Sequence, residues 1–186
     1  MQNKTTDVEY SIMDDSALVV IDIQNALFEG TVKPYQSEFF LSNVKAVLAA
    51  FRSRNLPVIY VQHTEGEDFR EHSHGWQIYP QIAPQPNDML VKKTTWDAFY
   101  LTNLDDLLIQ RQIGCPVFVG MQTEYCFDTT VRSSFAHGYR GILLSDAHTA
   151  FDSGVLPAEQ IIRHHNSVLC GRFAEGMTTE EFLNRF

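Results

Sequence analysis

Hydrophobic and polar positions follow two patterns along the chain, short continuous apolar runs and longer stretches with an apolar residue every three or four positions. The runs have the length and the β-branched and aromatic content of buried parallel strands, and the longer stretches have the spacing of amphipathic helices. Strands are predicted at residues 17–23, 58–63, 89–93, 116–119 and 141–147, and helices at residues 37–54, 104–113, 125–137, 157–170 and 178–183.

Alternation of strands and helices predicts an α/β fold with three α/β/α layers, a central, mostly parallel sheet and a Rossmann-type topology. The 186 residues are interpreted as a single domain, residues 1–186, with a polar N-terminal arm at residues 1–15. A long irregular stretch with three prolines, residues 75–88, interrupts the alternation. Such a loop is more typical of a binding-site wall or a subunit contact than of a linker.

Charge and composition exclude several classes of function. There are 23 acidic residues against 14 Lys and Arg, a formal net charge of −9. This balance repels nucleic-acid phosphates and anionic membrane surfaces, so neither partner is expected. No run reaches the roughly 18 apolar residues of a membrane span and no apolar leader precedes the first strand, so a soluble, cytoplasmic protein is expected. The three cysteines lack a CxxC spacing, which disfavours disulfides and structural zinc.

No cofactor motif is present. The chain has no G-x-G-x-x-G after a strand and no G-x-x-x-x-G-K-[ST], so no nucleotide cofactor is predicted. His63 ends a predicted strand, and the loop beyond it carries further His, Asp and Glu residues, a composition that suits zinc, iron or manganese. Their spacing fits no defined set of ligands, so no metal site is predicted.

Cys126 is the first candidate for chemistry, since it follows the strand at 116–119 and falls in the first turn of the next predicted helix. The unpaired N–H groups at a helix N-terminus stabilise a thiolate, so Cys126 is a candidate nucleophile. The alternative is a small buried hydrophobe, a common role of a free cysteine and the interpretation we favour for Cys115 and Cys170.

An acid and an amine are predicted beside this thiol, because the carboxyl ends of parallel strands meet at one crevice. Asp22 lies near the end of the first strand, and either Lys92 or Lys93 ends the third. Adjacent strand residues point to opposite faces, so only one of these lysines can face the crevice. The ammonium is expected to lower the pKa of the Cys126 thiol and the carboxylate to accept its proton. An acid that merely caps a loop is the alternative for Asp22.

Five segments together resemble the isochorismatase-like cysteine hydrolases, the superfamily of nicotinamidases and N-carbamoylsarcosine amidases. The likeness extends from Ala17 to about Ala150. The segments are VVIDIQNALF (19–28), VIYVQH (58–63), VKKTTWDAFYLTNLDDLL (91–108), VGMQTEYCFDTTVRSSFAHGY (119–139) and SDAHTA (145–150).

The resemblance implies a catalytic triad of Asp22, Lys93 and Cys126. It selects Lys93 over Lys92 because the lysine of the family stands six residues before the phenylalanine of an (S/D)-A-F element, here Phe99. It also implies a cis peptide bond before residue 122 and an oxyanion hole formed by the backbone N–H groups of Gln122 and Cys126.

The implied reaction is hydrolysis of a small amide or carbamoyl compound. The thiolate attacks the carbonyl carbon, an amine or ammonia leaves, and water releases the acid from a thioester. Expected pocket residues, each of which could equally be packed in the core, are Gln24, Phe28, Trp96 and Tyr100. A homo-oligomer, dimer or tetramer, is implied as well.

Two differences from named members of the superfamily disfavour two reactions, those of the metal-dependent nicotinamidases and of the true isochorismatases. Metal-dependent nicotinamidases carry an Asp-x-His pattern after the second strand, where this chain has Gln62 in place of the aspartate. True isochorismatases lack the nucleophilic cysteine that Cys126 supplies here. Two other classes of function stay open: a non-catalytic small-molecule-binding or assembly protein on the same fold, and a thiol redox sensor. The sensor has no resolving cysteine close in sequence.

Overall fold

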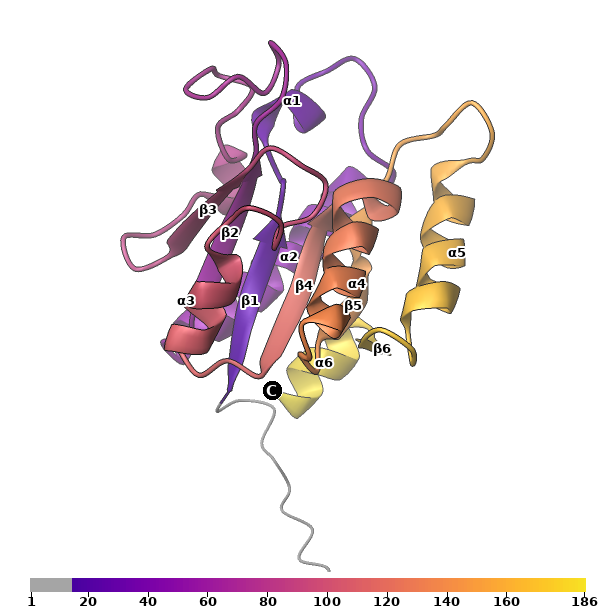
Figure 1. The fold of residues 1–186 in the computed structure, drawn as a ribbon. Coiled ribbons are helices and arrows are strands. Elements are labelled where there is room, and N and C mark those ends of the chain that lie inside the picture. Colours follow the sequence, from indigo (N-terminus) through magenta and orange to yellow (C-terminus); the bar gives the residue numbers. More distant parts are fainter. Residues whose placement is uncertain (1–14) are drawn as a thin grey trace, which may run out of the picture.

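The computed structural model describes residues 15–186, which form a sheet of six parallel strands in the order β3-β2-β1-β4-β5-β6 (Figure 1). The strands are β1 (Ser16–Ile21), β2 (Val58–His63), β3 (Met89–Lys93), β4 (Cys115–Met121), β5 (Ile142–Thr149) and β6 (Glu175–Met177). The predicted three-layer α/β/α fold is confirmed, and each strand is parallel to its neighbours. The predicted N-terminal arm, except for Asp15, lies outside the described residues.

Helices cover both faces of this sheet (Figure 1). They are α1 (Asn25–Phe28), α2 (Ser37–Ser53), α3 (Leu104–Gln110), α4 (Asp128–Ala136), α5 (Ala158–Leu169) and α6 (Thr179–Arg185), with a 3₁₀ turn η1 (Pro80–Ile82) and a π-helical turn η2 (Thr123–Phe127). Helices α2 and α6 pack on one face, α3 and α4 pack on the other, and α5 lies beside α4. None of these helices is long and apolar enough to cross a membrane.

Strand β1 lies at the centre of the sheet and explains the continuous apolar run in the sequence. Leu18 and Val20 face the core beneath α2 and α6, whereas Val19 and Ile21 face the core beneath α3 and α4. All four side chains are at most 1% exposed. A strand buried on both faces needs apolar residues at every position, so alternation is absent.

The sequence missed strand β6 and extended β1 by two residues. Strand β6 has only three residues, two of them exposed, and pairs with β5 at the edge of the sheet. No apolar run marks so short an edge strand. Strand β1 ends at Ile21, so Asp22 lies just beyond it in the connection to α1 rather than inside it.

The chain reverses its direction of winding between β1 and β4. Strands β2 and β3 lie on one side of β1, and β5 and β6 lie on the far side of β4. The connections that leave β1 and β4 therefore diverge, and a crevice opens at the carboxyl ends of these two strands. Ligands of open α/β sheets bind in this position.

The close approach of β4 to β1 at this crevice depends on Gly120, which pairs with Ile21. Its φ of +138° is a conformation that L side chains rarely adopt, and a Cβ added there would lie 2.2 Å from the carbonyl oxygen of Ile21. Any side chain at this position would therefore push the two strands apart immediately before Asp22.

We predict that Gly120→Ala lowers the free energy of unfolding by about 3 kcal/mol, because it combines an unfavourable φ with a backbone clash. Gly138→Ala is the matched control, since Gly138 also has a positive φ, +91°, but nothing lies within 4 Å of its added Cβ. Its loss is expected to be about 1 kcal/mol. Urea unfolding of both variants measures the difference, and equal losses would show that the contact with β1 is unimportant.

Candidate active site

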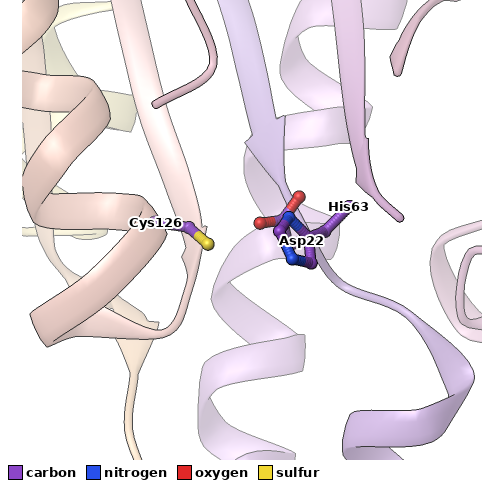
Figure 2. Close-up of side chains that lie close together, drawn as sticks. All are labelled: Asp22, His63 and Cys126. Atoms are coloured by element: carbon purple, nitrogen blue, oxygen red, sulfur yellow. The ribbon is translucent and has the colours of Figure 1, made fainter. Parts of the chain in front are cut away.

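Three strand ends bring an acid, an amine and a thiol into contact. Asp22 follows β1, Lys93 is the last residue of β3, and Cys126 lies in η2, directly after β4. The Lys93 Nζ atom is 2.6 Å from Asp22 Oδ2 and 3.1 Å from Cys126 Sγ. All three residues are buried. Figure 2 shows the thiol of Cys126 pointing toward the Asp22 carboxylate, with His63 beside it.

The backbone at Asp22 directs this carboxylate into the crevice. Its N–H donates to the Val61 carbonyl at 3.0 Å, which continues the pairing of β1 with β2 by one residue. Its φ of +52° then turns the chain away from the sheet. Asp is among the few residues other than glycine that adopt this conformation. The carboxylate atom Oδ1 is buried, and the ammonium of Lys93 pairs with the other oxygen, Oδ2. A hydrogen bond between the Cys126 thiol and this carboxylate contributes to the raised thiol pKa, so the carboxylate is placed to accept the thiol proton.

Cys126 lies in a π-helical turn, whereas the sequence placed it in the first turn of an α-helix. The Gln122 carbonyl accepts the N–H groups of Tyr125 and Phe127 at 3.1 and 3.2 Å, and helix α4 begins only at Asp128. Such π-helical turns often occur at functional sites. The peptide bond between residues 121 and 122 is cis, at the position that the resemblance implies.

The Lys93 ammonium has four partners and three N–H groups. Besides Asp22 and Cys126, its Nζ lies 3.0 Å from the Thr95 carbonyl oxygen and 3.0 Å from His63 Nδ1. A His63 Nδ1 that accepts this hydrogen bond requires a neutral ring with its proton on Nε2. That Nε2 lies 3.1 Å from Glu65 Oε2, to which it can donate.

The same geometry bears on metal binding. One ligand atom each from Asp22, His63 and Cys126 lie within 4.8 Å of one another, a spacing that could hold a metal ion. The Lys93 Nζ contacts all three of these side chains, at 2.6 to 3.1 Å. Lys93 therefore supplies the positive charge at the centre of the group, and a metal ion could bind there only if this side chain moved away.

The net pKa shift of the Cys126 thiol is opposite to the lowering expected from the sequence. Burial, and next to it the negative charge of Asp22, raise the pKa of the Cys126 thiol to about 12, and the opposing effect of Lys93 is smaller. Lys93 does lower this pKa, as expected, but burial and Asp22 outweigh it, so the net shift is upward. Because Asp22 already balances the charge of Lys93, the free site holds a neutral thiol beside an ion pair. A thiolate can form only as its proton is transferred to a base.

A pocket of about 230 Å³ opens onto this group. Asp22, His63 and Cys126 line it, and most of its other lining residues are apolar or aromatic. The other lining residues are Leu27, Glu65, Phe69, Trp96, Met121, Gln122 and Tyr125.

Of the four pocket residues expected from the sequence, only Trp96 lines this pocket. The Gln24 side chain is fully buried, where it bonds both backbone groups of His63. Phe28 stacks on Tyr79 in the core, and Tyr100 is 58% exposed outside the pocket. Gln24 thus holds the last residue of β2 in position through its backbone.

Sequence reasoning did not assign a catalytic environment to His63, nor a pocket role to Phe69 or Tyr125. A signal for His63 was available, because it ends a strand parallel to the one that ends at Lys93, and the two residues are paired in the sheet. No comparable signal marks Phe69, whose loop conformation the sequence pattern does not determine.

Comparison with known proteins identifies hydrolases among the relatives. A family model described as the isochorismatase domain matches residues 16–181. The uncharacterized isochorismatase family protein YddQ of Bacillus subtilis is 32% identical over 177 residues, which cover 90% of this chain and 98% of YddQ. Ureidoacrylate amidohydrolase RutB of Agrobacterium fabrum is 30% identical over 171 residues, covering 72% and 75%. The crystal structure of a cysteine hydrolase from Pseudomonas syringae superposes with a TM-score of 0.86, at 25% identity and 92% coverage of both chains.

We predict that Asp22→Asn accelerates alkylation of Cys126 by iodoacetamide at pH 7 by about tenfold or more. Removing the carboxylate charge leaves Lys93 unbalanced beside the thiol, which lowers the thiol pKa, and each pKa unit increases the thiolate fraction about tenfold. Lys93→Met has the opposite sign and slows the reaction. Peptide mass spectrometry measures both rates.

Cys115 provides an internal control in the same samples. Burial raises the pKa of its thiol to about 11, and neither Asp22 nor Lys93 contributes to that shift, so its alkylation rate should not change between variants. Fast alkylation of Cys126 below pH 7 in the wild type would contradict the neutral thiol.

Proposed function

The chain belongs to the isochorismatase family of hydrolases, which includes an amidohydrolase among its relatives, and we propose that it hydrolyses an amide or carbamoyl C–N bond of a small molecule through a thioester on Cys126. The observation that supports this most strongly is the contact of one ammonium, that of Lys93, with both the thiol of Cys126 and the carboxylate of Asp22. Nucleophile, base and stabilising charge are thus within reach of one reacting carbonyl.

In the first step, the Cys126 thiol transfers its proton to Asp22 as its sulfur attacks the carbonyl carbon of the substrate. The raised thiol pKa makes this transfer unfavourable in the free site, so the developing thiolate needs the Lys93 ammonium as its counter-ion. As Asp22 becomes protonated, Lys93 loses its charged partner and its stabilisation passes to the sulfur. The charge of Lys93 therefore remains balanced throughout the step.

The carbonyl oxygen becomes an oxyanion in the tetrahedral intermediate. We assign its stabilisation to the backbone N–H groups of Gln122 and Cys126, which belong to residues that both line the pocket. The proton on Asp22 then passes to the leaving nitrogen, the C–N bond breaks, and an amine or ammonia departs. Cys126 carries the acyl group as a thioester.

Water completes the reaction. Asp22, again a carboxylate, accepts a proton from the water that attacks the thioester carbon. The C–S bond breaks, the acid leaves, and the sulfur recovers a proton, which restores the neutral thiol and the Asp22–Lys93 ion pair. Buried as it is, Cys126 in the free site is a poor redox sensor, because its raised pKa leaves little thiolate to oxidise.

We predict that Cys126→Ala lowers kcat for ammonia release from small primary amides by at least about a thousandfold, since no nucleophile remains. Asp22→Asn and Lys93→Met should each cost at least about a hundredfold, because each removes a partner of the same proton transfer. A coupled ammonia assay over a panel of amides measures all three.

Cys170→Ala is the matched control, since Cys170 is half-buried beyond the end of α5 and does not line the pocket. It should retain wild-type activity. Equal activity of Cys126→Ala and Cys170→Ala would refute the covalent mechanism, and retained ligand binding without turnover in the wild type would favour the non-catalytic interpretation.

A further inference from the structure

The residues that line the pocket include acidic side chains but no basic ones other than His63. Of its ten lining residues, all in the described part of the chain, none is Lys or Arg. The two that carry negative charge are Asp22, which is paired with Lys93, and Glu65. Glu65 is therefore the one lining charge that no lysine or arginine is shown to balance.

Glu65 is fixed in place, although 58% of its side chain is exposed. Its backbone N–H donates to the Phe69 carbonyl, and the Phe69 N–H donates back to the Glu65 carbonyl, at 3.3 and 3.2 Å. Its Oε2 atom lies 3.1 Å from His63 Nε2. Hydrogen bonds of the Glu65 backbone and the contact of its carboxylate with His63 thus hold this residue in the pocket wall.

Three aromatic side chains, Phe69, Trp96 and Tyr125, line the same pocket as this carboxylate. The centroid of the His63 ring, which the carboxylate contacts, is 6.1 Å from that of Phe69 and 5.3 Å from that of Trp96. Tyr125 lines the pocket as well, and about half of the surface of Trp96 and of Tyr125 is exposed. The faces of such rings attract cations, most strongly in the case of tryptophan.

Lys92, next to Lys93 in the sequence, does not add positive charge to the pocket lining. Lys92, which precedes Lys93, points away from the pocket and forms an ion pair with Glu71. An anionic group that enters the pocket would therefore be repelled by Glu65, and no Lys or Arg among the lining residues offsets this repulsion. Because the Glu65 side chain is 58% exposed, solvent screens part of the repulsion.

We propose that the substrate is a small amide whose non-reacting end carries a positive charge, an ammonium or guanidinium, held by the Glu65 carboxylate and the ring of Trp96. The proposal rests on the hydrolytic function proposed above and adds the substrate class. Amides with a carboxylate at the same end are the poorest substrates, and uncharged amides are intermediate. Glu65 is in this view a residue that determines specificity, since it contacts the substrate away from the reacting bond.

Three amides of similar length test this order: 4-aminobutanamide, which is cationic, pentanamide, which is neutral, and glutaramate, which is anionic. The wild type should hydrolyse them with kcat/KM decreasing in that order. Glu65→Gln should lower the ratio of kcat/KM for the cationic to the anionic amide by roughly tenfold, the loss of one charged contact together with one repulsion. Glutamine can still accept the hydrogen bond from His63, so the substitution should leave the shape of the pocket wall unchanged.

Glu67→Gln is the matched control, because it removes the same charge two residues away, from a side chain that is 90% exposed and outside the pocket. In this variant the ratio of kcat/KM for the cationic to the anionic amide should stay within about twofold of the wild-type ratio, because an exposed charge outside the pocket is screened by solvent. A ratio that falls equally in both variants, or a wild type that prefers glutaramate, would overturn the proposal.

Binding to Cys126→Ala, measured by calorimetry with the same three amides, separates this proposal from the hydrolytic function. If the wild type hydrolyses none of them but Cys126→Ala binds the cationic amide most tightly, and Glu65→Gln in that background abolishes the preference, the hydrolytic proposal fails and the charge selectivity stands. If hydrolysis depends on Cys126 but neither kinetics nor binding shows a preference for the cation, the charge selectivity fails alone. If none of the amides binds up to 50 mM, the assignment of this pocket to small cationic amides is wrong.

Discussion

The site depends on the contacts that the buried ammonium of Lys93 makes with its neighbours. An ammonium without water needs a charged partner and further acceptors, and its nearest ones come from four different places in the fold. Asp22 follows β1, His63 ends β2, Thr95 follows β3, and Cys126 lies in the turn after β4. The ion pair therefore fixes the strand ends relative to one another, and the open crevice of the sheet becomes a defined constellation.

In the proposed mechanism, this charge arrangement lets a buried cysteine act as a nucleophile although its thiol is neutral in the free site. Asp22 balances the Lys93 charge, so burial dominates the thiol and its pKa is raised. Once the carboxylate takes the proton, the ammonium is released to the sulfur. In this mechanism the net charge of the three groups is zero both before and after the proton transfer.

The sequence was sufficient to predict the three-layer fold and to place Asp22, Cys126 and one of two adjacent lysines at one crevice, because parallel strands that end in polar residues must present them at a common edge. The family resemblance then selected Lys93. It could not predict the direction of the thiol pKa shift, which depends on the depth of burial and on the competition between two neighbouring charges. Nor could it separate Trp96, which lines the pocket, from Phe28, which packs in the core. Both are aromatic residues close in sequence to Asp22 or Lys93, and only the path of the loops distinguishes them.

Trapping of the acyl group tests the covalent account most directly, and it needs no knowledge of the natural substrate. The protein would be mixed with p-nitrophenyl acetate, quenched in acid within the first turnover, and digested for peptide mass spectrometry. The account predicts a burst of nitrophenolate equal to about one per active site and an acetyl group on the peptide that contains Cys126. Acetylation confined to surface lysines, with an unmodified Cys126 and no burst, would contradict it.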